Sequence, residues 1–154
     1  MKKILFIFVA IFIATSCVRE DQFNFESIDK IGFSNVSLVG ANIDSELTIS
    51  NQSRKRLTIK QVELNISKGE RTIARAKLQE PVVVNKRSQE SVEATIRLTT
   101  SPGIGAFALM GLANDIDQLT VEGFATIKLG AINRKIEIPP TPVKNLANAL
   151  GLQR

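Results

Sequence analysis

The sequence contains no His, no Trp and no Tyr among its 154 residues, and its one Cys is Cys17. Without an imidazole the chain has no Ser-His or Cys-His nucleophile, no His-ligated zinc and no ordinary pH switch. Any catalysis would have to use carboxylates, lysines or hydroxyls. We therefore expect a protein that is not an enzyme and that carries no cofactor and no metal ion.

The N-terminal segment has the composition of an export signal. Lys2 and Lys3 precede an unbroken apolar run over residues 4–14. A run of this length is enough for the core of a signal peptide, but a membrane-spanning helix needs about 20 residues. We therefore interpret residues 1–16 as a signal that is removed from the mature chain.

The end of this signal carries a lipid-attachment pattern. Small residues run into Cys17, a pattern that resembles the lipobox of bacterial lipoproteins; these residues are Ala14, Thr15 and Ser16. The resemblance implies cleavage before Cys17 and acylation of that residue, so that the membrane is a partner through the acyl chains. The alternative is an ordinary secretory signal followed by an unpaired thiol. Residues 17–22 then form a spacer, and Val18 favours the outer membrane by analogy with lipoprotein sorting.

The charge of the mature chain argues against nucleic acid as a partner. Without Lys2 and Lys3 the 20 basic residues fall to 18, against 15 acidic residues, which leaves a net charge of +3. Nucleic-acid-binding domains normally show a dense basic face and often aromatic platforms for base stacking. One domain with one core is expected at this size.

The body of the chain alternates apolar and polar residues with the period of half-buried strands. Three such sets are Ile43, Leu47 and Ile49; Val92, Ala94, Ile96 and Leu98; and Leu119, Val121, Ala125, Ile127 and Leu129. The apolar parity flips across Lys60 and Gln61, which predicts a β-bulge or a strand crossing there. We expect an all-β fold over residues 23–138, an immunoglobulin-like or fibronectin-like antiparallel sandwich of about seven strands.

Two short helices are expected beside the strands. Ser101 and Pro102 are typical of a helix start, which predicts a helix near 103–113, and Thr141-Pro142 predicts a second one near 142–150, within a C-terminal amphipathic segment 139–154. The first helix has apolar residues on more than one face. Its Leu109 and Met110 are candidates for an exposed contact patch, and the alternative is that the helix is fully buried.

The stretch from residue 36 to 99 resembles a known family. Asn51 stands between the strand-like segments 46–50 and 57–59, as does the asparagine-centred turn of the type 2 late-embryogenesis-abundant proteins, whose module is also called the water-stress and hypersensitive-response domain. The later strand-like segments also fit; they are 62–66, 72–74 and 82–84. The resemblance covers about residues 28–138. It implies a β-sandwich without catalytic activity and a role in stress protection or binding.

Two motifs suggest a nucleotide site and a metal site, but for both a purely structural role is favoured. The segment 103–108 fits the G-x-G-x-x-A dinucleotide fingerprint, but too little chain follows it for a parallel nucleotide-binding half. Asp115 and Asp117 lie close together in the sequence and suggest a calcium site, but the Gly and distal Glu of an EF-hand loop are missing. We expect a glycine-rich helix packed on a sheet in the first case and a solvated turn in the second.

The basic residues predict a charged pole. If the strands run alternately up and down, with 71–84 as one strand kinked at Pro81, the loops 51–56 and 85–89 and the turn at Gly130 fall at the same end. That end would collect five cations, Arg54, Lys55, Arg56, Lys86 and Arg87, and the first strand would start there. Such a pole would face the membrane. The alternatives are scattered loop charges and a chain reversal at Pro81.

Together these observations favour a lipid-anchored, non-enzymatic lipoprotein of a bacterial cell envelope that acts as a binding or envelope-protective module. Its partner would be a lipid or an envelope protein. One alternative is a subunit of an envelope assembly that docks through its apolar helices. A lesser alternative is a glycan-binding module, although sugar platforms usually use Trp or Tyr, which this chain lacks.

Overall fold

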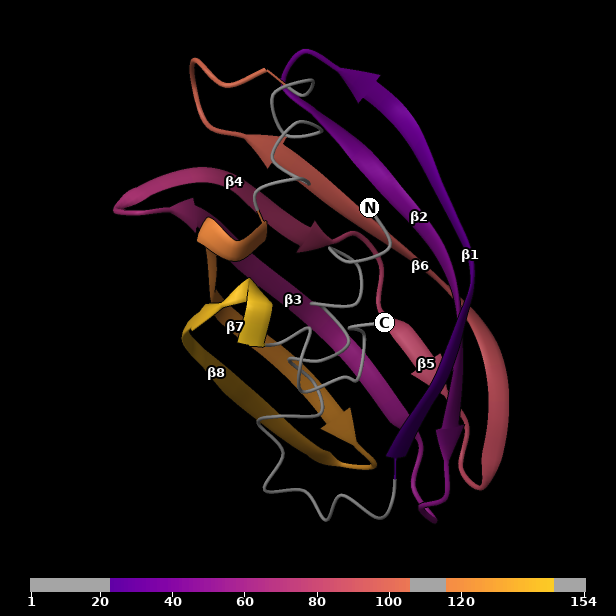
Figure 1. Cartoon of the computed structure of the whole chain (residues 1–154). Helices are drawn as coiled ribbons and strands as arrows, with labels where there is room; N and C mark the ends of the chain where they lie inside the picture. The colour runs from indigo at the N-terminus through magenta and orange to yellow at the C-terminus, as the bar shows by residue number, and fades with distance from the viewer. Residues whose placement is uncertain (1–22, 106–115, 146–154) are drawn as a thin grey trace.

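A computed structural model describes residues 23–105 and 116–145 of the chain (Figure 1). The described residues form eight strands, one short 3-10 helix, η1, and a helical segment at 143–145. The elements are β1 (Phe23–Ser37), β2 (Gly40–Asn51), β3 (Leu57–Lys68), β4 (Arg71–Leu78), β5 (Val82–Val84), β6 (Ser88–Thr100), η1 (Ile116–Gln118), β7 (Leu119–Leu129) and β8 (Ile132–Pro142). None of the helices within these residues has the length and apolar character needed to cross a membrane.

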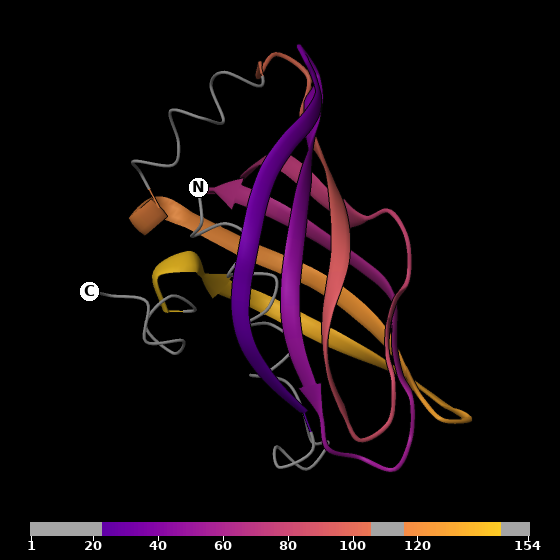
Figure 2. The same cartoon turned by 90° about the vertical axis from the view of Figure 1, so that its right-hand side faces the viewer.

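The strands pair antiparallel in one curled sheet, which confirms the predicted all-β fold class. The order is β1-β2-β6-β4-β3-β7-β8, and β5 pairs with β3 beyond the end of β4. Figure 2 shows β1, β2 and β6 as a layer in front of the strands β3, β7 and β8, which cross it obliquely. The two layers are joined through the β4–β6 pairing, so hydrogen bonding is continuous across the whole sandwich.

β4 and β5 behave as a single strand with a kink at Pro81, which is the condition on which the predicted basic pole depended, and the alternative of a chain reversal at Pro81 is wrong. Both run antiparallel to β3, with Glu63 to Lys68 paired to β4 and Leu57 to Ile59 paired to β5. Proline cannot donate a ladder hydrogen bond, so it interrupts the pairing without reversing the chain. Counted this way, the sandwich has the predicted seven strands.

The core lies between the two layers and is built from the predicted alternating positions. In β2, β6 and β7 the buried residues alternate with half-buried or exposed ones, whereas Val92 and Leu129 are half-buried at the margin. The most deeply buried apolar side chains are Leu64, Ala74, Ala76, Val84, Val121, Ala125 and Val143. Burying a side chain of Val or Leu size stabilises the fold by about 1.5–3 kcal/mol.

The predicted bulge is present in β3. The register between β3 and β7 shifts between Ile59 and Gln61, so that Lys60 is an extra residue without a partner in that ladder. Lys60 is exposed, and the buried positions change parity across it, from Leu57 to Val62. The neighbour of β3 on its other side changes from β5 to β4 at the same place.

The predicted helix start at residue 103 is wrong. Residues 101–105 form a turn in which the Ile104 N–H donates to the Ser101 carbonyl at 3.0 Å, and Gly103 has φ +83°. Pro at the second position and Gly with positive φ at the third are typical of a type II turn. The remainder of the predicted helix, 106–113, lies outside the described residues.

The second predicted helix begins where expected, and the predicted domain boundary before it is wrong. Residues 143–145 are helical, and the rest of the helix lies outside the described residues. The boundary at residue 139 falls inside β8, because this strand runs on to Pro142. β8 is an edge strand, where prolines are tolerated because a missing N–H disturbs only the open side of the ladder.

Candidate functional site

The predicted basic loops meet at one end of the sandwich, the lower end in Figure 1. The strand registers establish this, because the end of β2 at Asn51 pairs with the start of β1 at Phe23 and with the start of β6 at Ser88. The start of β3 at Leu57 pairs with the end of β5 and the end of β7. We call the five exposed cations of the loops 52–56 and 85–87 the basic pole; they are Arg54, Lys55, Arg56, Lys86 and Arg87.

Backbone hydrogen bonds join the loops of the basic pole directly. The Arg87 N–H donates to the Ser53 carbonyl at 3.0 Å, which ties the loop after β5 to the loop after β2. The Gly130 N–H donates to the Arg56 carbonyl at 3.0 Å, which ties the β7–β8 turn to the same loop. The pole is therefore one connected structure rather than a set of separate loops.

Asn51 organises these loops from beneath. Its side chain is completely buried, and its Nδ2 group donates to the carbonyls of Lys55 at 2.9 Å, Asn85 at 3.0 Å and Val84 at 3.3 Å. Its Oδ1 atom accepts the Ser53 N–H at 3.0 Å. One amide therefore satisfies backbone groups from both loops, as buried polar groups require.

Ser53 and Gly130 complete the local geometry of the loop after β2. The Ser53 hydroxyl donates to the Lys55 carbonyl at 2.8 Å and accepts the Lys55 N–H at 3.0 Å. Gly130 has φ +61°, and the aliphatic part of Lys55 lies against it, 3.1 Å from where a Cβ would stand. This contact holds the loop against the β7–β8 turn, and the charged end of Lys55 remains exposed.

A carboxylate holds the loop after β5. Glu90 accepts the Asn85 N–H at 2.8 Å and the Asn85 side-chain amide at 2.7 Å. These hydrogen bonds, with smaller effects from Ser88 and the charge of Arg56, lower the pKa of Glu90 below its ordinary value. Arg87 in the same loop has φ +49°, a conformation that is uncommon for a residue with a Cβ. The loop geometry is thus fixed by specific contacts.

The β7–β8 turn adds an apolar side chain and further cations to this end. Ile132, which pairs with Leu129 at the turn, is 52% exposed. Arg134 is exposed, and Lys135 lies with its Nζ atom 4.5 Å from the centre of the Phe124 ring and 3.1 Å from the Glu137 carboxylate. The end therefore combines basic loops with exposed aliphatic side chains, Ile132 in the turn and Val83 on β5.

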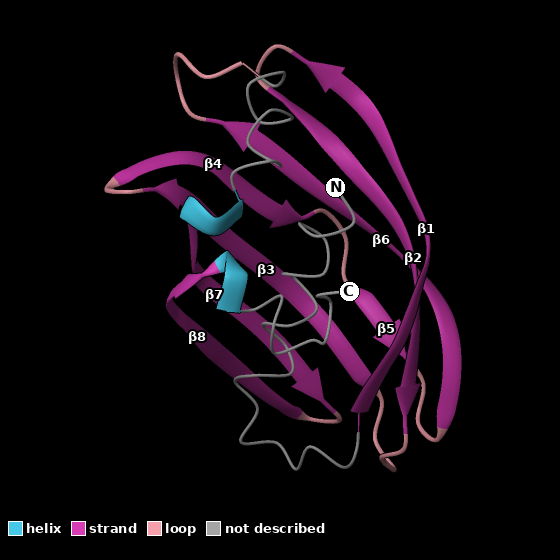
Figure 3. Cartoon of the chain, viewed as in Figure 1, coloured by secondary structure: helices cyan, strands magenta, loops and turns pink. Residues whose placement is uncertain are grey.

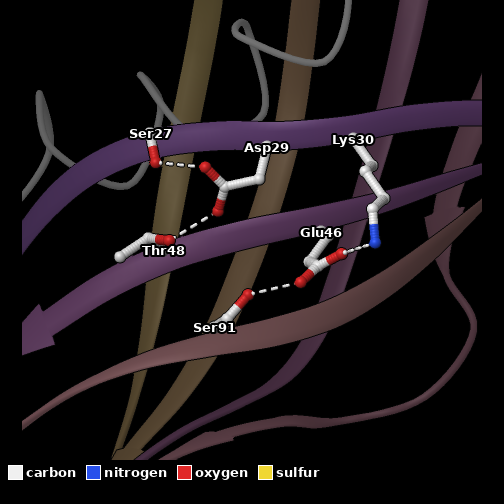
Figure 4. Close-up of polar contacts among 6 residues, drawn as sticks. All are labelled: Ser27, Asp29, Lys30, Glu46, Thr48 and Ser91. Atoms are coloured by element: carbon white, nitrogen blue, oxygen red, sulfur yellow. Dashed lines mark hydrogen bonds and ion pairs between the residues drawn. The ribbon is translucent and has the colours of Figure 1, made fainter.

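The outer face of β1, β2 and β6 carries a ladder of polar contacts (Figure 4). Glu46 on β2 accepts from Lys30 at 2.8 Å and from Ser91 at 2.9 Å, which links β1 to β6 across β2. Asp29 accepts from Ser27 at 2.7 Å and from Thr48. The hydrogen bonds lower the pKa of Asp29, with Thr48 the largest cause, and of Glu46, with Lys30 the largest. These contacts fix β1 on the sheet.

The opposite end of the sandwich has a different character. The tip of the β1–β2 hairpin exposes a group of apolar side chains; they are Phe33, Val36, Leu38 and Val39. We call this group the apolar tip. Sequence reasoning missed it; two of its residues, Leu38 and Val39, form the turn between β1 and β2. Figure 3 shows this hairpin at the top and the basic loops at the bottom.

Several predicted site residues cannot be placed. Ala14, Thr15, Ser16, Cys17, Leu109 and Met110 lie outside the described residues, as does Asp115. Asp117 is described, and its carboxylate lies 3.7 Å from Lys144 Nζ at the end opposite the basic pole. No cluster of three potential metal ligands occurs within 23–105 and 116–145.

Comparison with protein-family models and with curated proteins gives no match. A solved structure entitled "Crystal structure of protein from Archaeoglobus fulgidus" is similar to this chain, with 18% sequence identity and a TM-score of 0.48. The similarity covers 77% of this chain and 91% of the archaeal chain.

Proposed function

We propose that this protein is a lipid-anchored, non-enzymatic module of a bacterial cell envelope, held at the membrane by acylated Cys17. It acts as a binding or envelope-protective domain, as its resemblance to type 2 late-embryogenesis-abundant proteins implies. One observation carries the proposal: the first strand that the structure describes begins at Phe23, six positions after Cys17. The eight strands of the described residues thus all lie on the C-terminal side of the proposed anchor.

The experiment is a substitution at the anchor. Cys17→Ser leaves no thiol for acylation, so we expect loss of palmitate labelling, retention of the signal segment and loss of stable membrane attachment. The control is Ser16→Ala, which keeps a small residue before the cysteine and should still be labelled. Palmitate labelling of the Cys17→Ser protein would contradict the proposal.

A second candidate function is supported by the apolar tip. Leu38 and Val39 are 76% and 61% exposed at the end opposite the basic pole, where a partner in an envelope assembly could reach them. Exposed apolar groups on this scale are typical of interaction sites. Leu38→Ser with Val39→Ser should change stability by about 0.5 kcal/mol or less. Loss of a stoichiometric partner from membrane pull-downs of this variant would favour assembly, whereas the absence of a stoichiometric partner from pull-downs of the wild type would favour a stand-alone module.

A further inference from the structure

We propose that the basic pole docks on the anionic headgroups of the membrane that holds the lipid anchor. The inference rests on the proposed function for its orientation, but the charges and the loop frame that carry it belong to the described fold. The occupant is the bilayer surface, and the pole is the face of the domain turned toward it.

The tether between Cys17 and β1 is short. Residues 18–22 separate Cys17 from Phe23, so the tether reaches at most about 20 Å. β1 has 15 residues and extends about 50 Å at about 3.3 Å per residue. The start of β1 is therefore held near the membrane, and the apolar tip at its far end is out of reach in an end-on orientation.

The cations of the basic pole lie at the end of the domain from which the tether leaves. The exposed cations of the basic pole lie beside the start of β1, since Phe23 pairs with Asn51 and the loop 52–56 follows at once. The opposite end carries mixed charge, because Asp117 lies beside Lys144 and the β3–β4 turn holds Glu70 between Lys68 and Arg71. Cations near an anionic bilayer are attracted over a Debye length, which is about 8 Å at physiological ionic strength. The tether therefore holds the cations within working range of the headgroups.

The two basic loops are held together as one surface. The hydrogen bonds of Asn51 and Ser53 hold the two basic loops together, so the charges form one surface. Ile132 stands at the same end, 52% exposed, where an aliphatic side chain can enter the headgroup region. We expect a salt-dependent contribution from the loop cations and a salt-independent contribution from Ile132.

The test uses the mature chain from residue 17 with Cys17→Ser, which has no acyl chain and keeps every strand. It is mixed with vesicles of phosphatidylglycerol and phosphatidylcholine, and with vesicles of phosphatidylcholine alone. We expect binding to the anionic vesicles that weakens as salt is raised. Equal binding to both kinds of vesicle, or no binding to the anionic kind, overturns the proposal.

Two variants with the same change of charge separate the pole from net charge. The pole variant carries Arg54→Ser, Arg56→Ser and Lys86→Ser, and the control variant carries Arg71→Ser, Arg75→Ser and Lys144→Ser, all exposed positions away from the pole. At about 1 kcal/mol per cation, which is about 5-fold in affinity, the pole variant should bind about 100-fold more weakly. The control should stay within about 3-fold of the parent by the same scale.

Two further results would overturn the proposal. An equal loss in both variants would show that net charge acts without a pole. Competition by inorganic phosphate at constant ionic strength would show a small-anion site in place of a membrane surface. Thermal unfolding of each variant shows that the domain is folded. Palmitate labelling at Cys17 is independent of this assay, so failure of the vesicle test leaves the lipid anchor standing, and the reverse holds as well.

Discussion

Removal of the Asn51 amide tests how the basic pole is built. Asn51→Ala would leave the carbonyls of Lys55, Val84 and Asn85 and the N–H of Ser53 without this partner. An unmade buried hydrogen bond costs about 1–3 kcal/mol, and water reaches part of these exposed loops, so we expect a loss of about 3 kcal/mol. For a domain of this size that lowers the melting temperature by about 10 °C.

A second substitution at Asn51 distinguishes hydrogen bonding from packing. Asn51→Asp has nearly the same size and keeps an acceptor for the Ser53 N–H, but it places a carboxylate against three carbonyl oxygens. We therefore expect it to be at least as destabilising as Asn51→Ala, because a buried charge without a partner is costly. The control is Asn85→Ala, whose exposed side chain bonds Glu90 and should cost about 1 kcal/mol or less.

Urea and thermal unfolding followed by circular dichroism measure these differences. From most to least stable, we expect the order wild type, Asn85→Ala, Asn51→Ala, Asn51→Asp. If Asn51→Asp were as stable as the wild type, the amide would not be the donor that holds the loops. If Asn51→Ala were no worse than the control, the network would contribute nothing to folding.

The remaining predictions concern a carboxylate and a glycine. Glu90 has a lowered pKa in the folded state, so its contribution to stability is present above the ordinary value of 4.5 and is lost as the pH falls through the folded-state value. The melting temperature of Glu90→Gln should therefore lie below that of the wild type at pH 7 and converge with it in acid; a constant gap would refute the linkage. Gly123→Ala should destabilise by several kcal/mol, on the order of a severe core substitution, because its Cβ would stand 2.1 Å from the Glu63 carbonyl oxygen. Gly32→Ala, with nothing within 4 Å, is the control, and equal melting temperatures of the two variants would contradict the steric argument.

The strands and their core could be predicted from the sequence because one physical rule governs them. Alternating burial requires alternating apolar residues, so the sets around Ile43, Ile96 and Ile127 indicate their strands directly. The bulge at Lys60 was also predictable, because an extra residue changes the parity of burial on its strand. The convergence of the basic loops followed from up-and-down pairing once Pro81 was taken as a kink.

The turn at 101–104 shows where local signals fail. Ser101 and Pro102 suit a helix N-terminus and also the first half of a type II turn, so these two residues do not distinguish the structures. Gly103 does, because its positive φ suits the third turn position and not a helix. The same reasoning applied to the sequence would have favoured a turn.

The contacts of Asn51 could not be predicted for a different reason. The sequence marks a turn at this residue, but only Lys55 of its three acceptors lies on the adjoining loop, whereas Val84 at the end of β5 and Asn85 in the next loop are more than 30 positions away. Only the pairing of β2 with β6 and of β3 with β5 brings them together. The apolar tip escaped prediction because its residues are exposed, so no buried face imposes a pattern on them.

The most direct test of the account measures which end of the lipidated protein faces the bilayer. With Cys17 acylated, Arg56→Cys and Leu38→Cys each introduce a thiol for a fluorescent label, one at the basic pole and one at the apolar tip. The proteins are reconstituted in vesicles whose lipids carry a headgroup quencher. We expect quenching at position 56 and none at position 38, since β1 with its 15 residues extends up to about 50 Å between the two ends. Equal quenching at both positions, or stronger quenching at position 38, would contradict it.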